Sequence, residues 1–376
     1  MQKIISSDND HAQLDEWIVK NNVKRLMLVS GASIKKQEIN SYFETLHDRL
    51  CTDIIRFSGF SPNPDYESIV NGVELFRENN CDAIIAVGGG SAMDVAKCIK
   101  LYCRMDGNGE EGSYLKQTII PNDIPFLVMP TTAGTGSEAT RFAVIYYNGN
   151  KQSVAHESCI PDTVLMDAQA LKSLPDYHRK ASMMDAFCHA IESAWSVNST
   201  EESRKYAYDA IQLIMEHKDG YLANSDEGNR GMLLAANMAG KAINITQTTA
   251  GHAMCYKITG LFGCAHGHAA ALCVRILYLW MAESIADDGM ECIDPRGKEH
   301  LKGVLDDIAH AMGCDGAVSG AECFGSVFDE LGFSIPDATQ EQYSILKTSV
   351  NPDRLKNYPV RMDEDTIDML YHRILR

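Results

Sequence analysis

The chain has 376 residues, 45% of them hydrophobic, so it is long enough for two domains and too apolar to be disordered. Its 34 basic and 51 acidic residues give a net charge of −17, which disfavours nucleic acid and anionic membrane as partners. Any anionic ligand must therefore be held by a local positive site.

The first half of the chain alternates short β-rich runs with helical patterns. Strands are predicted at 25–30, 53–57, 83–88, 125–130, 142–147 and 163–167, and helices near 36–49, 65–79 and 91–104. Alternation of this kind predicts a parallel sheet wrapped by helices. From about residue 178 onward the periodicity is almost exclusively helical. The sequence therefore predicts an α/β fold, with a sheet domain over 1–176 and an all-helical domain over 177–376.

A glycine-rich turn joins the strand predicted at 83–88 to the next helix. Gly88, Gly89 and Gly90 let the backbone come close to a ligand. The helix start that follows presents free N–H groups and a positive dipole end to a phosphate. Ser91 and Asp94 have the spacing of a helix capping pair. A tight, well-capped turn is therefore the alternative interpretation.

A second loop of small polar residues, 130–140, follows the strand predicted at 125–130. Loops that follow parallel strands meet at the carboxyl edge of the sheet, where open α/β folds bind ligands. The two loops together favour a dinucleotide or other phosphate ligand over an ordinary turn. In the second loop the candidate contacts are Thr131, Thr132, Thr135 and Ser137.

Four side chains in the helical half suit a divalent cation. Asp185 and His189 are four residues apart, so a helix places both on one face. His252 and His266 are separated by glycines that turn the chain, so two helices can deliver both rings to one point. Three imidazoles and one carboxylate suit Fe²⁺ or Zn²⁺ better than Mg²⁺ or Ca²⁺. Spacing alone leaves core or surface histidines as the alternative.

The cysteines and the apolar runs bear on the cellular compartment. The twelve cysteines are scattered without a CxxC pair, which is typical of reduced thiols in a cytoplasmic protein. The first residues are too polar for a secretory signal. The longest apolar run, 269–282, contains Arg275 and is short for a bilayer span. We expect a cytoplasmic protein.

Four motifs match the iron-containing (group III) alcohol dehydrogenases in order and approximate spacing, and the resemblance covers essentially the whole chain. They are GGGSxxD at 88–94, TTxGTGSE at 131–138, DxxxH at 185–189, and the histidines at 252 and 266. The resemblance implies a Rossmann-like domain, a helical domain and an active site in the cleft between them. It also implies a homodimer, with the cofactor pyrophosphate anchored at Gly88 to Ser91.

The resemblance further implies that Asp185, His189, His252 and His266 are the metal ligands, because each matches a ligand position in type. Fe²⁺ follows from the family, and Zn²⁺ is compatible with the same ligands. The metal would act as a Lewis acid in a hydride transfer between a nicotinamide cofactor and a small aldehyde.

Two positions depart from the family pattern. Many members carry a further histidine four residues after the third ligand, suspected in proton relay, where this chain has Tyr256. A phenol is a poorer relay at neutral pH, so the proton comes from water or from a relay that includes Tyr256 or His268. Relatives that prefer NAD often place an aspartate after the first strand, where this chain has Gly31. Loss of that carboxylate favours NADP(H) over NAD(H).

Within the family, segments at 140–146, 154–158, 192–203 and 248–273 are most similar to the enzymes that reduce phosphonoacetaldehyde to 2-hydroxyethylphosphonate. A phosphonate needs a cationic partner, and Arg141 and Lys257 are the candidates, with a solvated charge as the alternative for each. His268 cannot point the same way as His266, and a structural histidine is the alternative to a catalytic one.

Three other functions remain open from the sequence. The first is a general short-chain alcohol dehydrogenase of the same family. The second is a lyase like the related dehydroquinate synthases, which use the nicotinamide only transiently. The third is a non-catalytic metal or nucleotide binder, against which the intact set of four candidate ligands argues.

Overall fold

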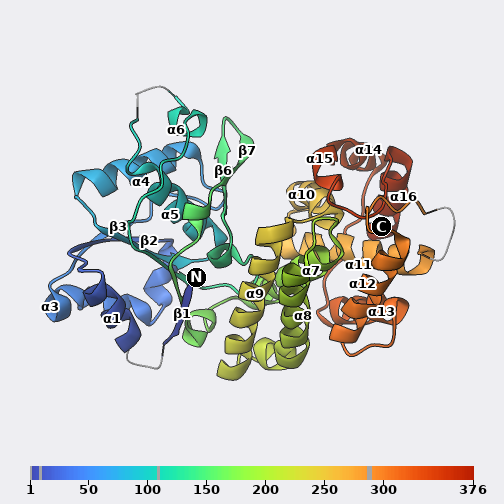
Figure 1. The fold of residues 1–376 in the computed structure, drawn as a ribbon, viewed down its shortest axis with the longest axis horizontal. Coiled ribbons are helices and arrows are strands. Elements are labelled where there is room, and N and C mark those ends of the chain that lie inside the picture. The colour runs from blue at the N-terminus through green and yellow to red at the C-terminus, as the bar shows by residue number, and fades with distance from the viewer. Residues whose placement is uncertain (1, 8–10, 108–110, 286–289) are drawn as a thin grey trace. The chain divides into compact units, whose positions relative to one another are not determined.

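The computed structural model describes residues 2–7, 11–107, 111–285 and 290–376. The chain divides into two compact units, which are described here one at a time (Figure 1). The sheet unit is Met1–Thr132 with Gly136–Leu174, and the helical unit is Ala133–Thr135 with Pro175–Arg376.

The sheet unit is built on a parallel sheet with the strand order β1-β8-β5-β4-β2-β3. The strands are β1 (Lys3–Ser6), β2 (Arg25–Ser30), β3 (Asp53–Phe57), β4 (Ala83–Gly88), β5 (Phe126–Pro130) and β8 (Thr163–Met166). In this register Gly88 lies opposite Pro130 and Val87 lies opposite Ser30. The loops that follow β2, β4 and β5 therefore leave from the same edge of the sheet.

Helices cover both faces of the sheet, because successive strand residues point to opposite sides. Leu26, Leu28 and Ile85 share a core with α1 (Ala12–Lys20), η1 (Ala32–Lys36), α2 (Ile39–Glu44) and α3 (Leu46–Leu50). Met27, Ile84 and Phe126 share the opposite core with α4 (Tyr66–Glu78) and α5 (Gly90–Tyr102) (Figure 1). This confirms the predicted sheet wrapped by helices.

Two details of the sheet unit differ from the sequence prediction. The single helix expected near 36–49 is instead two short helices, α2 and α3, which meet at Thr45. Before them Gln37 is extended (ψ 141°), and its buried side chain donates to Ser173. The run 142–147 forms β6 (Phe142–Tyr147) outside the parallel sheet, in an antiparallel hairpin with β7 (Asn150–Ala155). Asn148 and Gly149 both have positive φ at that turn, as tight hairpins require.

The remaining short elements of the sheet unit are α6 (Ser113–Lys116), η2 (Ser137–Ala139), η3 (Glu157–Cys159) and η4 (Ala168–Leu171).

The described part of the helical unit is built from helices, as the periodicity from about residue 178 predicts, and several of them pack against α7. Its helices are α7 (Asp176–Trp195), α8 (Glu201–Leu222), α9 (Asp226–Thr246), α10 (Ala250–Phe262), α11 (His266–Ser284), α12 (Lys298–Ala311), α13 (Ala317–Glu330), α14 (Gln340–Ser349), α15 (Pro352–Leu355) and α16 (Glu364–Ile374). Helix α7 is almost wholly buried from its middle to its end and packs against α8, α9 and α11. Among the described helices, none combines the length and the apolarity that a bilayer span needs.

Side-chain caps set several of these helix starts. Thr200 and Thr339 form capping boxes at α8 and α14, and Ser225 and Asp363 accept hydrogen bonds from the first turns of α9 and α16. Polar side chains thus fix the ends of helices whose packed faces are apolar.

Candidate functional site

The four candidate metal ligands come together in the helical unit. Asp185 and His189 lie one turn apart on α7, His252 lies near the start of α10, and His266 is the first residue of α11. From the Oδ1 atom of Asp185, the Nε2 atoms of His252, His266 and His189 are 3.5, 3.8 and 4.0 Å away. The structure therefore brings three helices to one point, the candidate metal centre.

The candidate metal centre is buried and lacks hydrogen-bond partners where a cation would bind. Asp185, His189 and His252 are at most 6% exposed. Within the described part of the chain, Asp185 Oδ1 and His252 Nε2 have no hydrogen-bond partner. Buried polar atoms without partners are costly, and a divalent cation would satisfy both. The donor set thus fits a metal of the Fe²⁺ or Zn²⁺ type.

The sequence analysis missed a second buried carboxylate at this site. Glu192 is fully buried on α7, and its Oε2 atom makes a very short contact with Nδ1 of His252. Its Oε1 atom accepts from the backbone N–H of Thr249 at 3.0 Å and from the hydroxyl of Thr249 at 2.6 Å. The carboxylate holds the proton of His252 on Nδ1 and leaves Nε2 to face Asp185.

The neighbouring charges shift the pKa values of these groups. Burial lowers the pKa of His252, but the carboxylates of Glu192 and Asp185 outweigh burial and raise it to about 9. Burial raises the pKa of Asp185, but the imidazoles of His189, His252 and His266 outweigh burial and hold it well below its usual range. The pKa of His189 is lowered, chiefly by burial. A cation bound at Nε2 of His252 would compete with a proton for that atom.

Two glycines let the helices approach closely enough to assemble this centre. A Cβ atom on Gly267 would lie 2.0 Å from the carbonyl oxygen of Ala181 and 2.7 Å from Cβ of Asp185. A Cβ atom on Gly251 would lie 3.0 Å from the carboxylate of Glu192. Each glycine is next in sequence to a candidate ligand, so ligand position and helix packing are linked.

Tyr256, one turn after His252 on α10, lies beside the candidate metal centre. Its ring stacks on His266, with centroids 5.6 Å apart and planes 17° apart. Its hydroxyl accepts a hydrogen bond of 3.1 Å from Nη1 of Arg354. Burial raises the pKa of Tyr256, against the opposing effect of Arg354. Tyr256 therefore keeps its proton at neutral pH.

His268, the other candidate for proton relay, points away from the candidate metal centre. Its Nδ1 atom is 3.1 Å from the hydroxyl of Tyr177, and its Nε2 atom is 2.9 Å from the carbonyl oxygen of Ser334. Its ring stacks on Phe333. The residue lines a cavity of about 420 Å³ between the start of α7 and residues 331–334. Both ring nitrogens have partners, which favours the structural role that the sequence left open.

The candidate cofactor residues lie at the carboxyl edge of the sheet. Gly31 follows β2 and Gly88 ends β4, two adjacent strands whose connections run in opposite directions, as at the switch points where α/β sheets bind nucleotides. Gly89 is the N-cap of α5 and has no side-chain cap. The buried hydroxyl of Thr132 has no hydrogen-bond partner among the described residues, and it lies 3.3 Å from the site of a Cβ on Gly89. This cradle of small residues fits a phosphate.

Asp94 and Ser137 lie beneath this cradle and are bonded to each other. The carboxylate of Asp94 accepts from the Ser137 hydroxyl at 2.8 Å and from the Val144 N–H at 3.0 Å. Lys97, which is fully buried, donates to Ser137 at 2.9 Å. The expected capping pair of Ser91 and Asp94 is therefore wrong, because the carboxylate turns toward the second loop instead.

Other candidate cofactor residues have different surroundings. Ser91 follows Gly90 in the first turn of α5, and Thr131 donates its backbone N–H to the carbonyl oxygen of Gly88. Thr135 belongs with the helical unit, where a Cβ on the neighbouring Gly134 would lie 2.8 Å from the carbonyl oxygen of Ser182.

The two candidate cations for substrate binding differ in their surroundings. Arg141 is 3.2 Å from the carboxylate of Glu157, and its guanidinium lies 5.2 Å from the centroid of Phe142. Lys257 is exposed on α10. Arg141 is thus already next to an acid, and Lys257 is a solvated charge.

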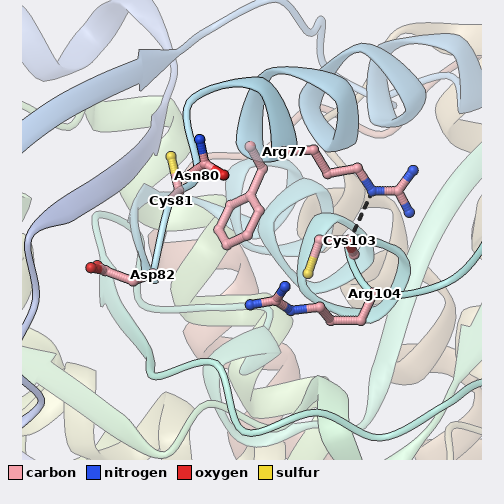
Figure 2. A pocket seen from close by; sticks show the side chains of 7 residues that line it. Arg77, Asn80, Cys81, Asp82, Cys103 and Arg104 are labelled. Atoms are coloured by element: carbon pink, nitrogen blue, oxygen red, sulfur yellow. Dashed lines mark hydrogen bonds between the residues drawn. The ribbon is translucent and has the colours of Figure 1, made fainter.

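A pocket of about 280 Å³ in the sheet unit has no comparable chemistry (Figure 2). Arg77 in its wall donates to the carbonyl oxygens of Tyr102 and Cys103 at 2.9 Å each. Burial raises the pKa of the Cys81 thiol to about 12, so the thiol is unreactive. Because Cys81 precedes β4, the pocket lies at the edge of the sheet opposite the phosphate cradle.

Comparison with known proteins identifies the relatives of this chain. The model of the iron-containing alcohol dehydrogenases matches residues 1–168, and that of the C-terminal domain of the Fe-containing alcohol dehydrogenase family matches 180–332. Phosphonoacetaldehyde reductase of Streptomyces viridochromogenes is 28% identical over 81% of this chain and 79% of its own. Long-chain-alcohol dehydrogenase 1 of Geobacillus thermodenitrificans is 29% identical over 82% and 79%.

A solved structure shows the same fold. Sulfoacetaldehyde reductase from Bifidobacterium kashiwanohense, in complex with NAD⁺, superimposes with a TM-score of 0.86 at 23% identity, covering 99% of this chain and 96% of its own.

The first prediction concerns Glu192. In Glu192→Gln the amide would donate to Nδ1 of His252 and move the ring proton to Nε2, which faces Asp185. Metal affinity should fall by about 10- to 100-fold, measured by titration of the metal-free protein with Fe²⁺ or Zn²⁺. His268→Gln is the matched control, because both nitrogens of that ring bond elsewhere. Unchanged affinity in Glu192→Gln would show that the carboxylate does not orient the ligand.

The second prediction concerns helix packing. Gly267→Ala should lower the free energy of unfolding by about 1–3 kcal/mol, because its Cβ overlaps Ala181. It should also reduce the bound metal per chain, because the same Cβ presses on Asp185. Gly303→Ala, in an open position on α12, should be neutral or stabilising by up to about 1 kcal/mol. Denaturant titration and metal analysis of both variants test this, and equal effects would contradict it.

Proposed function

The chain belongs to the iron-containing alcohol dehydrogenase family and is an NAD(P)-dependent, metal-containing oxidoreductase, and on this premise we propose that it reduces phosphonoacetaldehyde to 2-hydroxyethylphosphonate. The observation that carries the proposed chemistry is the convergence of one carboxylate and three imidazoles from α7, α10 and α11. The proposed substrate is supported by the similarity to the reductase of Streptomyces viridochromogenes.

In this proposal Asp185, His189, His252 and His266 hold Fe²⁺, with Zn²⁺ as the other cation that suits them. When bound, the cation supplies Lewis acidity toward the carbonyl group of the aldehyde. Glu192 keeps Nε2 of His252 free for the cation by holding the proton on Nδ1. The hydroxyl of Tyr256 is the protein group best placed to exchange a proton near His266.

The proposed cofactor site is the cradle at the carboxyl edge of the sheet. Gly88 to Ser91 would hold the pyrophosphate through backbone N–H groups, with Thr131 and Thr132 beside them. Asp94 and Ser137 would position the second loop rather than touch the cofactor. We propose NADP(H), because Gly31 offers no carboxylate and Lys35 and Lys36 lie exposed in the following turn.

The alternative function is a general short-chain primary alcohol dehydrogenase. The observation that favours it is the contact between Arg141 and Glu157, because an arginine beside an acid has less positive charge to offer a phosphonate. The relative from Geobacillus thermodenitrificans, a long-chain-alcohol dehydrogenase, shows that the family is not restricted to charged substrates.

The proposed working form is a cytoplasmic homodimer. The support for the compartment is that the twelve cysteines are all free thiols, most of them buried, as in reducing surroundings. The dimer rests on the family resemblance alone.

The substrate prediction is tested with anaerobically Fe²⁺-loaded protein. The kcat/KM for phosphonoacetaldehyde should exceed that for propionaldehyde by about tenfold or more, equivalent to about 1.4 kcal/mol of differential transition-state binding. The measurement is the oxidation of NADPH followed by absorbance. An equal or reversed preference would leave the general alcohol dehydrogenase and remove the phosphonate.

The cofactor prediction is tested at Gly31. The wild-type protein should prefer NADPH, and Gly31→Asp should shift the ratio of kcat/KM values toward NADH by about tenfold or more, because a carboxylate repels the 2′-phosphate. Gly31 has φ −76°, and only Ser33 lies within 4 Å of the position that a Cβ would take, so an aspartate fits without strain. Gly31→Ala adds the Cβ without the charge and should leave the ratio unchanged. A wild-type preference for NADH would contradict the prediction.

A further inference from the structure

Arg354 is a half-buried cation in the helical unit that no carboxylate neutralises among the described residues. It lies on α15, and its Nη1 atom donates to the hydroxyl of Tyr256 at 3.1 Å. Its Cζ atom lies 5.1 Å from the centroid of the Tyr256 ring. The adjacent acid, Asp353, is instead paired with Lys356 at 2.6 Å. No ion pair within the described part of the chain includes Arg354, so it keeps its charge and most of its five N–H donors.

The position of Arg354 links it to the candidate metal centre. The Tyr256 ring, against which Arg354 lies, stacks on His266. His266 is the most exposed of the four candidate ligands, with 38% of its side chain accessible, against 7% or less for the other three. The ring of Tyr256 therefore lies between the Arg354 guanidinium and the most accessible of the candidate ligands.

Three other arginines of the helical unit are paired with carboxylates. Arg275, Arg296 and Arg361 each face a carboxylate, from Asp329, Asp294 and Glu291 respectively. The chain as a whole carries a net charge of −17 and repels anions. Arg354 differs from these three arginines because no carboxylate among the described residues is paired with it.

We propose that Arg354 binds the anionic head group of the aldehyde substrate, with Tyr256 holding the guanidinium in place. This inference rests on the proposed function, because it requires an aldehyde that carries a phosphonate. The planar fork of an arginine donates two parallel hydrogen bonds to such a group, which a lysine cannot reproduce. In this proposal Arg354 binds the phosphonate, in place of Arg141 or Lys257, which we expected from the sequence.

A purely structural role is the competing explanation, since the contact with Tyr256 also attaches α15 to α10. The two explanations differ in their effect on substrate choice. Loss of a structural contact impairs charged and neutral aldehydes alike, whereas loss of an anion contact impairs only the charged one.

The test compares Arg354→Gln, Arg354→Lys and the control Lys302→Gln in Fe²⁺-loaded protein. The ratio of kcat/KM for phosphonoacetaldehyde to that for propionaldehyde should fall about 10- to 100-fold in Arg354→Gln, mainly through KM for the phosphonate. Arg354→Lys should show a smaller fall, because it keeps the charge. Lys302→Gln removes an exposed charge from α12 and leaves the pair of Asp353 and Lys356 intact, so it should leave the ratio unchanged.

A binding measurement that needs no turnover completes the test. The Kd of 2-hydroxyethylphosphonate, measured by calorimetry, should rise by a similar factor in Arg354→Gln and stay constant in Lys302→Gln. If the wild type prefers the phosphonate but the ratio and Kd are unchanged in both Arg354 variants, the role of Arg354 is overturned and the proposed function stands. If the wild type has no preference for the phosphonate, the proposed substrate and the role of Arg354 fall together.

Discussion

The contact between Glu192 and His252 is the constraint on which the candidate metal centre depends. A carboxylate that is fully buried is tolerable only if its lone pairs are satisfied, and Glu192 accepts from Thr249 twice and from the His252 ring. Those bonds fix the start of α10 against α7 and the direction of the His252 ring. Since Nε2 of that ring is directed at Asp185, the position of a cation is set by a residue that would not touch it.

The sheet unit also contains a fully buried charged side chain, in this case the cation Lys97. Lys97 is fully buried, and its ammonium donates to Ser137, Thr140 and the carbonyl oxygen of Phe142, which holds the second loop against α5. Its pKa is lowered by burial, against the opposing effect of Asp94. In each unit a buried charged side chain orders a loop or helix start. The ligand-facing surface is then left to backbone amides, small hydroxyls and imidazoles.

The strands at 25–30, 53–57 and 83–88 were predictable from the sequence, because short apolar runs rich in β-branched residues between helical patterns are typical of buried strands. The four candidate ligands were found from their types and order. Glu192 was not, because its partner lies 60 residues away and only packing joins them. The role of Asp94 was also missed, because its carboxylate accepts hydrogen bonds from Ser137 and Val144 instead of capping the helix. Local patterns thus located the elements, but long-range bonds decided what the polar side chains do.

Under the proposed function, the net charge of the molecule would restrict the recognition of an anionic substrate to few residues. A chain with a net charge of −17 gains nothing from a broad basic surface, and any guanidinium beside an acid is already neutralised. Arg141 is paired with the carboxylate of Glu157, whereas Arg354 lies against the neutral phenol of Tyr256. Because Asp353 is paired with Lys356, the segment that carries Arg354 keeps its own acid away from the guanidinium. An anion-binding group can therefore exist in an acidic protein when the neighbouring acids already have partners.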